Sequence, residues 1–377
     1  MGPLSQIRVI EMEGLGPCPF AGMMLADLGA EVIRVGRAKP PILQTAIDVF
    51  DRGKQSVVLD LKGPASKKAL LKLVEGADVL LEGFRPGVME RLGIGPDTCL
   101  EINPRLVYGR MTGWGQEGPL SQRAGHDINY LAIAGALHCI GRKGQKPIAP
   151  INLVADFGGG GLLLAFGVLA ALLEREHSGQ GDVVDAAMVD GVGTLMASIF
   201  AGLQAGFFSE RRGENLLDSG APFYDTYETK DGKFVSVGAL EPQFYQILIE
   251  RLGLQGSAPP PLAHMQATQW EALRLEMEEL FLTRTRDEWR EIFDETDACV
   301  VPVLSPTEAF EHPHNLARKS FVDVGGSRQP RPAPRFSRAD PPTPEPAHEL
   351  GADTLRVLKD SGVSEEDVAA VLRETAR

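Results

Sequence analysis

Residues 7–35 have the sequence IRVIEMEGLGPCPFAGMMLADLGAEVIRV, in which two short apolar runs flank a turn and a helix-like segment. The pattern predicts, in order, a strand, a turn, a helix and a second strand at 7–12, 13–19, 20–29 and 30–35. This succession is typical of a βαβ unit. The sequence therefore predicts an α/β fold from this stretch onward.

The predicted turn contains Gly14-Leu15-Gly16, which is similar to the start of a dinucleotide-binding loop. Pro19 stands where that loop needs its third glycine, and Gly36 stands where an acidic residue would follow the second strand. We therefore do not expect a nicotinamide cofactor at this turn.

Strand-like and helix-like segments keep alternating after the opening unit. Strands are predicted at 56–62, 78–84, 106–116 and within 181–191, and helices at 63–77 and 85–96. Alternation at this spacing predicts a large Rossmann-like domain, with a doubly wound, mainly parallel sheet and right-handed crossovers.

The character of the chain changes near residue 205, where a polar stretch leads to a predicted hairpin around Asp231-Gly232. Three helices and an apolar strand follow at 242–253, 268–281, 286–297 and 298–304. These elements predict a smaller α+β domain. We expect a large domain at 1–205, a linker at 206–222, the small domain at 223–315, and at 316–377 a return linker, proline-rich at 327–347, with a C-terminal segment that completes the large domain.

The chain has 377 residues, of which 43% are hydrophobic and 24% charged, as in an ordinary globular protein. Its formal net charge of −13 leaves no basic excess to meet phosphates, so we do not expect general binding to nucleic acid or to acidic membranes. The four cysteines are scattered, and the histidines form no ligand-spaced pair beyond His312 and His314. We expect reduced thiols, no metal site and a cytoplasmic location.

Two apolar runs need a separate interpretation. Residues 161–173 are fewer than the roughly 20 that a membrane span needs, and residues 188–208 are interrupted by Asp190 and Gln204. We predict that the second run is one buried helix and that the protein does not enter a membrane. The opening MGPLSQIRVIE lacks the apolar core of a signal peptide, and the final RETAR is not a peroxisomal signal.

Residues 125–161 carry two candidate proton carriers, His126 and Asp156. Each stands just before an apolar, helix-like segment, where unpaired N–H groups and the helix dipole stabilise negative charge. An imidazole has an ordinary pKa of about 6.5, and an apolar pocket could raise the pKa of the Asp156 carboxyl toward it. Such a pair beside free amide donors suits removal of a proton next to a carbonyl.

Each of these residues also has a purely structural interpretation. A lone histidine is more often structural than catalytic, and Asp156 could serve only as a helix N-cap. The glycines at 158–161 favour a function, because they let a ligand approach the backbone closely. Glu241 stands at another predicted helix start and could orient the His126 ring if it reached it.

Basic residues gather in the first hundred positions of this acidic chain: Arg34, Arg37, Lys39, Arg52, Lys54, Lys62, Arg85 and Arg91. Arg85 and Arg91 follow a predicted strand end, which is where open α/β sheets bind ligands. A local cationic rim fits a substrate that carries several phosphates.

Several motifs together resemble the α-methylacyl-CoA racemases, within the family III CoA-transferase superfamily: AGHDINYLAIAG, PINLVADFGGGG, DVVDAAMVDG, GAPFYDTYET and GALEPQFY. The resemblance runs in collinear order from LADLGAEVIRV to PAPRFSR. It implies a homodimer of two interlocked chains, with the active site between the large domain of one subunit and the small domain of the other.

The resemblance also implies an activity, the interconversion of (2R)- and (2S)-2-methylacyl-CoA thioesters through an enolate held by backbone N–H groups. His126 and Asp156 match the family's two acid/base residues, and Glu241 matches the residue that pairs with the histidine from the partner subunit. The implied CoA-thioester contacts are Arg37, Leu59, Asp60, Leu61, Lys62, Gly83, Phe84, Arg85, Arg91, Gly125, Asp127, Ile128, Asn129 and Tyr130. No metal and no separate cofactor is implied, because CoA is part of the substrate.

Two other functions stay open at this point. A CoA-transferase of the same fold would use Asp156 as a nucleophile and would not need His126 as a proton carrier. A non-catalytic acyl-CoA-binding protein would need neither residue. Gly36 departs from the acidic residue common there in the family, so recognition near the adenosine could differ.

Overall fold

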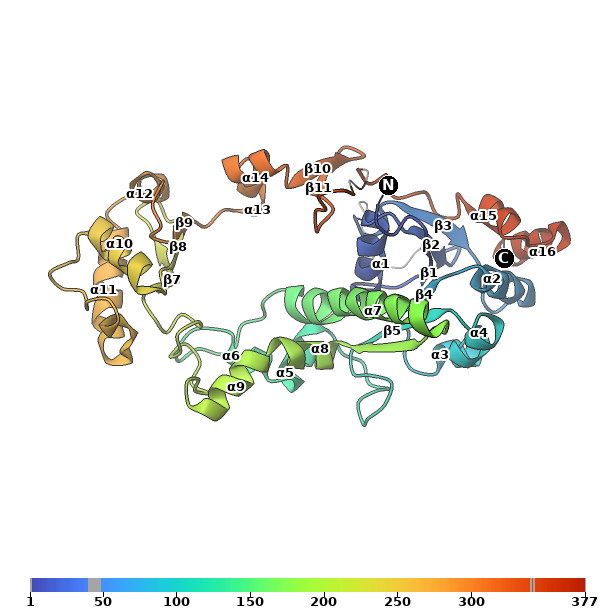
Figure 1. Ribbon diagram of the computed structural model, residues 1–377, viewed down its shortest axis with the longest axis horizontal. Coiled ribbons are helices and arrows are strands. Elements are labelled where there is room, and N and C mark those ends of the chain that lie inside the picture. Colours follow the sequence, from blue (N-terminus) through green and yellow to red (C-terminus); the bar gives the residue numbers. More distant parts are fainter. Residues whose placement is uncertain (1, 40–48, 340, 342, 377) are drawn as a thin grey trace. The chain divides into compact units, whose positions relative to one another are not determined.

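The computed structural model describes residues 2–39, 49–339, 341 and 343–376. The chain divides into two compact units (Figure 1). Unit 1 comprises Met1–Ala134, Ile151–Leu195 and Leu316–Arg377, and unit 2 comprises Gly135–Pro150 and Met196–Asn315. Residues 135–150 thus cluster with unit 2, although the stretches on either side of them belong to unit 1. The predicted domain boundaries stay a prediction.

Unit 1 contains a six-stranded, fully parallel sheet in the order β3-β2-β1-β4-β5-β6. The strands are β1 Arg8–Met12, β2 Glu31–Gly36, β3 Lys54–Val58, β4 Val79–Glu82, β5 Val107–Thr112 and β6 Val183–Ala187. The predicted parallel α/β sheet is therefore confirmed. Strands β3, β4 and β5 end earlier than predicted, and just beyond β3 and at the end of β5 a side chain accepts from a nearby backbone amide. Asp60 Oδ1 accepts from the Lys62 amide at 3.1 Å, and Thr112 Oγ1 accepts from the Gly115 amide at 2.9 Å.

Helices cover both faces of this sheet (Figure 1). Tyr108 points into a core shared with α2 Pro64–Glu75, α3 Val88–Leu92, α4 Pro96–Ile102, α15 Thr354–Asp360 and α16 Glu365–Thr375. A Cβ on Gly109, the next residue of β5, would lie 3.0 Å from Leu164 and 3.3 Å from Val168 of α7 Leu162–Ser178. Because side chains alternate along a strand, α7 covers the opposite face, and it packs there beside α1 Pro17–Asp27.

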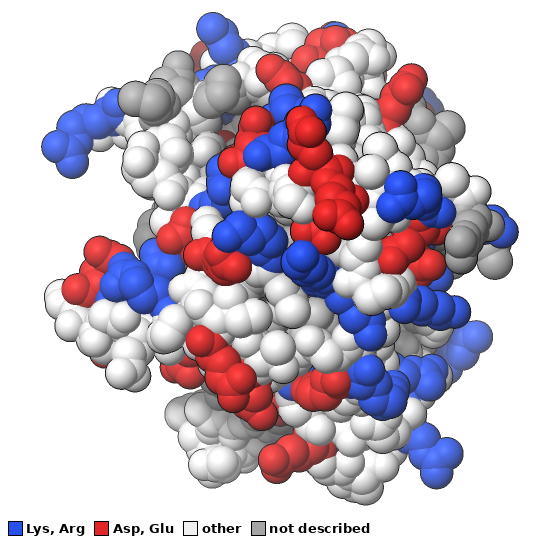
Figure 2. Space-filling view, turned by 90° about the vertical axis from the view of Figure 1, so that its right-hand side faces the viewer, with Lys and Arg blue, Asp and Glu red and all other residues white. Residues whose placement is uncertain are grey.

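The outer surface formed by α2, α15 and α16 carries charges of both signs, interspersed (Figure 2). Lys68 of α2 pairs with Asp367 of α16 at 2.8 Å, and solvent screens this exposed pair. A second contact joins these two helices. The carboxylate of Glu374 in α16 accepts from the backbone N–H groups of Ala65 and Ser66, and it thereby caps the start of α2. The final segment of the chain is in this way part of unit 1.

The apolar run predicted to be too short for a membrane span is part of a longer helical segment. A π-helix, η2 Leu153–Gly161, continues directly into α7, so the helical run extends over 26 residues from Leu153 to Ser178. Within the described residues, this is the one helix that is long and apolar enough to cross a membrane by length and composition. Core helices pass the same test, and this one packs on β5 and β6 as the crossover between them.

The prediction of one buried helix at 188–208 is wrong. The run forms two helices, α8 Met188–Leu195 and α9 Ala197–Ala205, which meet at an angle of 50°. None of the residues of α9 is buried in the chain. The break coincides with the passage of the chain from unit 1 to unit 2 after Leu195, so α8 belongs to unit 1 and α9 to unit 2.

The contact that holds α8 depends on two glycines. A Cβ on Gly191 would lie 1.8 Å from the carbonyl oxygen of Gly159 in η2. We expect Gly191→Ala to destabilise the protein by about 1–3 kcal/mol or more, because rigid backbone would have to move. Gly193→Ala on the same helix is the matched control. A Cβ there meets nothing within 4 Å, so this change should be neutral or slightly stabilising. Urea unfolding of both variants checks the difference, and equal midpoints would contradict it.

Unit 2 is built on a three-stranded antiparallel sheet, β7 Tyr224–Glu228, β8 Phe234–Gly238 and β9 Val300–Pro302. The predicted hairpin is confirmed, and Gly232 supplies the positive φ of 69° that its turn requires. Its helices are α10 Pro242–Leu252, α11 Trp270–Phe281, α12 Arg286–Phe293 and α13 Pro306–Ala309, with α14 Pro313–Arg318 at its end. Tyr227, Tyr245 and Phe281 are among the aromatic side chains of its core.

The proline-rich stretch 327–347 is not only a connecting strap. Its first residues form β11 Ser327–Pro330, which pairs antiparallel with β10 Phe321–Val324. The sequence prediction missed this hairpin because its turn, Gly325-Gly326, lies just before the proline-rich residues. Residues 340 and 342 of the predicted strap lie outside the described residues.

Candidate active site

The order of the strands locates the ligand-binding edge of unit 1. Because the order reverses between β1 and β4, ligands are expected at the carboxyl ends of these two strands. The loops after β2, β3 and β4 carry Arg37, Leu59–Lys62 and Gly83–Arg85, which were predicted as CoA contacts. Since all the strands are parallel, the fold brings these separate segments to one edge of the sheet.

The predicted CoA contacts differ in how far their side chains are exposed. The side chains of Arg37, Lys62, Arg85 and Arg91 are exposed, so their charges are available to a ligand. Leu59 is fully buried in the core of the sheet. A ligand at this position would therefore contact its backbone and not its side chain.

A buried ion-pair network, which sequence reasoning missed, lies beneath this cationic edge. Arg110 of β5 donates through Nε to Glu82 at 2.9 Å and through Nη1 to Glu90 of α3 at 2.8 Å. The second oxygen of Glu82 accepts from the Phe84 backbone N–H at 2.7 Å. Burial raises the pKa of Glu82, while Phe84 and Arg110 oppose that rise. The network fixes the loop and the helix that carry Arg85 and Arg91. The sequence signal for it was a charged residue inside each of two apolar strands.

The position of Gly36 has a structural explanation. A Cβ there would lie 3.1 Å from Oε1 of Glu13, which follows β1. That carboxylate accepts from Arg34 Nη2 at 3.0 Å, and its other oxygen lies 3.5 Å from Arg37 Nε. A carboxylate is thus present at the end of β2, but it comes from β1 and is already paired.

His126 is the N-cap residue of α5 Asp127–Ile133, as predicted, and its side chain is exposed. Its backbone N–H donates to Oδ1 of Asn129 at 3.0 Å, which fixes the start of the helix. Asp127 occupies the first helical position, where a backbone N–H has no partner within the helix. The neighbourhood of His126 therefore offers an imidazole and an amide donor on adjacent residues. The predicted helix is split, since α6 Ala136–Cys139 follows separately.

Asp156 is not an N-cap, which corrects one sequence interpretation. It is the fourth residue of η2, and Asn152 precedes that segment. Its half-buried carboxylate accepts from Asn152 Nδ2 at 3.2 Å, and Oδ2 would lie 3.6 Å from a Cβ on Gly16 in the loop after β1. Asp156 therefore lies beside the β1 loop, where ligands are expected. Burial raises the pKa of Asp156, the nearby Asp127 charge adds to the rise, and Asn152 and His126 oppose it. π-Helical turns are rare and are frequent at functional sites.

Most of the glycines behind Asp156 serve packing. A Cβ on Gly159 would meet the Val192 amide at 2.8 Å, one on Gly160 would meet the Ala155 carbonyl at 2.8 Å, and one on Gly161 would meet the Pro17 carbonyl at 2.5 Å. Gly158 is less confined, with 3.3 Å to the Leu153 carbonyl. The expectation that these glycines open space for a ligand is therefore wrong for Gly159–Gly161, which let η2 pack against α8 and α1.

The loop 125–130 is supported from inside. The buried Tyr130 ring contacts Trp114 edge to face at 4.8 Å between centroids, and its hydroxyl donates to the Gly125 carbonyl at 2.5 Å. Burial, with the charges of Asp156 and Asp127, raises the pKa of Tyr130 to about 12, so it stays a neutral donor. Among the predicted contacts of this loop, Ile128 and Asn129 are exposed, whereas Tyr130 is buried.

Glu241 belongs to unit 2, where it is the N-cap residue of α10 and exposed. Pro242 follows at the first helical position, as is favourable there. The predicted pairing of Glu241 with His126 stays a prediction.

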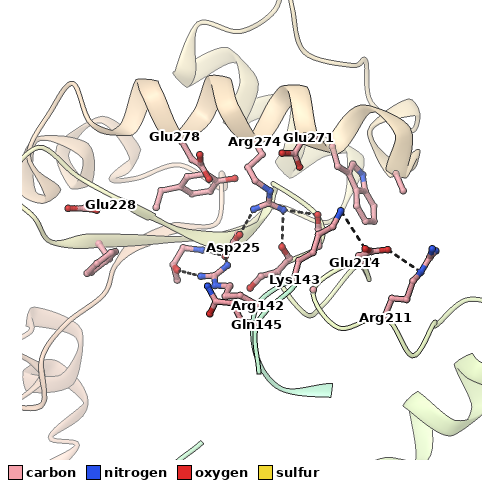
Figure 3. A pocket seen from close by; sticks show the side chains of 18 of the residues that line it. Arg142, Lys143, Gln145, Arg211, Glu214, Asp225, Glu228, Glu271, Arg274 and Glu278 are labelled. Carbon is pink, nitrogen blue, oxygen red and sulfur yellow. Dashed lines mark hydrogen bonds and ion pairs between the residues drawn. The ribbon is translucent and has the colours of Figure 1, made fainter. Parts of the chain in front are cut away.

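Unit 2 contains a cavity of about 770 Å³ that includes none of the predicted site residues (Figure 3). Its basic side chains point to neighbouring acceptors and not to an open anion site. Arg142 and Arg274 both bind Asp225, and Arg274 also donates to the carbonyls of Ser219 and Gly220 at 2.8 and 2.7 Å. The pair of Arg142 with Asp225 binds the segment 135–150 to the hairpin of unit 2. We therefore interpret the charged residues of this cavity as stabilising unit 2 and not as binding a ligand.

Among the described residues, no group of three or more His, Cys, Asp or Glu side chains is arranged to hold a metal ion. The site of unit 1 has instead an exposed imidazole, a half-buried carboxylate of raised pKa and a rim of exposed cations. These groups fit proton transfer on an anionic substrate.

The class of protein follows from the fold and the sequence together. The model of the CoA-transferase family III matches residues 4–354, and the chain belongs to this family. It is 46% identical over 368 residues to mouse alpha-methylacyl-CoA racemase, covering 97% of this chain and 95% of that one. The human alpha-methylacyl-CoA racemase is 45% identical over 372 residues, with the same coverage.

More distant relatives include transferases and solved structures. Succinyl-CoA--D-citramalate CoA-transferase of Chloroflexus aurantiacus is 30% identical, with 97% of this chain and 96% of that one covered. The crystal structure of the protein Rv3272 of Mycobacterium tuberculosis superposes with a TM-score of 0.80 at 29% identity, covering 95% and 99% of the two chains. A CAIB/BAIF family protein from Brucella suis shares the fold with a TM-score of 0.82, over 96% and 99% of the chains.

Proposed function

We propose that this protein is an α-methylacyl-CoA racemase, which interconverts (2R)- and (2S)-2-methylacyl-CoA thioesters. The identity of 45–46% to the mouse and human racemases extends over 97% of the chain. The observation that carries the proposal is that unit 1 holds both an exposed imidazole, His126, and a half-buried carboxylate, Asp156, which are the two kinds of proton carrier that a racemase needs. The CoA-transferase mechanism needs only the carboxylate.

In the proposed mechanism one of these groups removes the α-proton and the other returns a proton to the opposite face. The thioester oxygen becomes negative in the enolate, and the N–H of Asp127, at the first position of α5, would donate to it. Removing one donor of this kind typically costs about 3 kcal/mol of transition-state stabilisation. Burial raises the pKa of the Asp156 carboxyl above its ordinary value, which is the direction that suits a group that must both remove and return a proton. In this proposal Glu241 of the partner subunit would stabilise the imidazolium form of His126.

The CoA moiety is proposed to lie along the carboxyl edge of β2, β3 and β4. The exposed cations Arg37, Lys62, Arg85 and Arg91 would meet its phosphates, with the backbone of Leu59 and Gly83 beside them. No metal and no other cofactor is required, because the thioester itself acidifies the α-position. The cytoplasmic location expected from the composition is part of the proposal.

An interlocked homodimer, with each active site shared between subunits, completes the proposal. Exposed apolar side chains support it. Leu162, Phe166 and Leu173 of α7 are 49, 68 and 66% exposed, and their spacing of four and seven residues places them on one side of the helix. Phe207 after α9 is 89% exposed. A second copy of the chain would cover these surfaces, and sedimentation equilibrium should give about twice the chain mass of 40.7 kDa.

The activity is tested by incubating the purified protein with one enantiomer of a 2-methylacyl-CoA in D2O. We expect deuterium at the α-position, seen by NMR, together with loss of optical purity. A sample without exchange would refute the racemase. If adding a free carboxylic acid then produced acyl transfer, Asp156 would be a nucleophile and the protein a CoA-transferase.

A further inference from the structure

The side chain of Asp127 joins the two segments that carry the proposed proton carriers. It is 7% exposed, and its Oδ2 accepts from the backbone N–H groups of Ala155 at 2.8 Å and of Asp156 at 2.9 Å. Asp127 itself follows His126 directly. One carboxylate oxygen thus connects the residue after His126 to the backbone of Asp156, which lies 29 residues beyond Asp127.

This contact satisfies a need of η2. The first N–H groups of a helical segment have no partners within it, and a carboxylate is favourable beside them. Ala155 and Asp156 are the third and fourth residues of η2, so Asp127 accepts from two of these donors. Two hydrogen bonds to a charged acceptor in a buried position hold the distance between the loops closely.

The same carboxylate places a negative charge beside Asp156. Its Oδ1 is buried without a hydrogen-bond partner in the described chain, so the charge on that side is not neutralised by a donor. The other groups that act on Asp156 are the imidazole of His126 and the amide of Asn152, and the Tyr130 phenol nearby is bonded to Gly125. Asp127 is thus the acidic side chain that acts on Asp156.

We propose that the Asp127 side chain is a positioning residue for racemisation, which fixes His126 and Asp156 relative to each other and holds a negative charge beside the Asp156 carboxylate. This inference rests on the proposed function and goes beyond the role of the Asp127 backbone N–H. The Asp127 side chain would contribute to racemisation in two ways, through the geometry of the two loops and through its charge, and different substitutions remove each contribution.

Asp127→Asn keeps an acceptor oxygen of the same reach and removes the charge. The pKa of Asp156 should then fall, because a neighbouring charge that raises it is gone. For the enantiomer whose proton Asp156 removes, kcat/KM declines as Asp156 becomes protonated, so that acid limb should move to lower pH in the variant. Asp127→Glu keeps the charge but, with its longer side chain, displaces the carboxylate that binds the Ala155 and Asp156 amides. It should keep the limb nearer its wild-type position and lower kcat by roughly 10²-fold, the usual effect of a displacement of about 1 Å.

A readout independent of activity is the 13C NMR titration of the Asp156 carboxyl in the full-length protein, which should move in Asp127→Asn and not in Asp185→Asn. Asp185 is a matched control, since it is a carboxylate of unit 1 that also accepts a backbone N–H, from Gln116 at 3.1 Å. An unchanged titration in Asp127→Asn, or wild-type kcat in Asp127→Glu, would overturn the inference. If Asp127→Asn does not fold, the titration is measured in Asp127→Ser, which also removes the charge but has a shorter reach, so that only the charge effect on Asp156 is compared. If the wild-type protein had no racemase activity but the Asp156 titration still shifted in Asp127→Asn, the effect of Asp127 on Asp156 would stand and only the proposed function would be refuted.

Discussion

Replacing Asp156 by asparagine is expected to lower kcat for racemisation by about 10³-fold or more, since a general acid–base residue typically contributes 10²–10⁴-fold and here both directions of reaction need it. The amide can still accept from Asn152, as the carboxylate does at 3.2 Å, so the local structure should be preserved. Thioester binding should change little, because the exposed cations of the sheet edge lie on other loops. Steady-state kinetics in both directions and the affinity for a non-reactive acyl-CoA check this prediction.

Asp97→Asn is the control for that substitution. It removes the same charge from an exposed carboxylate in the first turn of α4, away from η2. Its kcat should equal that of the wild type. An Asp156→Asn protein that kept more than a small percentage of activity would show that Asp156 is not one of the two proton carriers.

His126→Gln should also abolish racemisation, but with a distinctive isotopic result. With two carriers on opposite faces, each removes the α-proton of one enantiomer only. A protein that keeps only Asp156 can therefore exchange the proton of one enantiomer with D2O and return deuterium to the same face. We expect exchange of that enantiomer without loss of optical purity, and no exchange of its mirror image. NMR with chiral analysis checks both.

His314→Gln, an exposed histidine of α14, serves as the control and should racemise normally. Exchange of both enantiomers by His126→Gln would indicate that a single group reaches both faces of the substrate. The mirror-image result in Asp156→Asn, where the other enantiomer exchanges, would complete the assignment of each carrier to its face.

Much of the sheet could be predicted from local sequence. The alternation of apolar strands with helices at 7–116 depends on side chains that are neighbours in the chain, and the predicted parallel sheet is present. The predicted edge loops after β2, β3 and β4 lie at the carboxyl ends of these strands for the same reason. The long apolar run at 188–208 was predicted less well, because its composition does not show that α8 packs against η2 while α9 leaves unit 1.

In the candidate site, too, some residues could be placed from local sequence and others could not. His126 could be placed at a helix start from its neighbours alone, and the structure agrees. The place of Asp156 could not be predicted in this way, because η2 begins before it. The raised pKa of Asp156 depends on burial and on the charge of Asp127, which are tertiary properties. The sequence showed a charged residue, Glu82 or Arg110, inside each of two apolar strands, but it did not show that these two side chains bind each other, since the pair joins β4 to the neighbouring strand β5.

The sequence by itself determined the alternating elements, the acidic character and the residues available for proton transfer, since these depend on composition and on short-range periodicity. The tertiary structure decided which of those residues meet. The strand order brings four loops to one edge, close glycine contacts place η2 against α1 and α8, and Asp127 links His126 to Asp156. These relations join segments far apart in the chain, and they exist only once the intervening residues have packed.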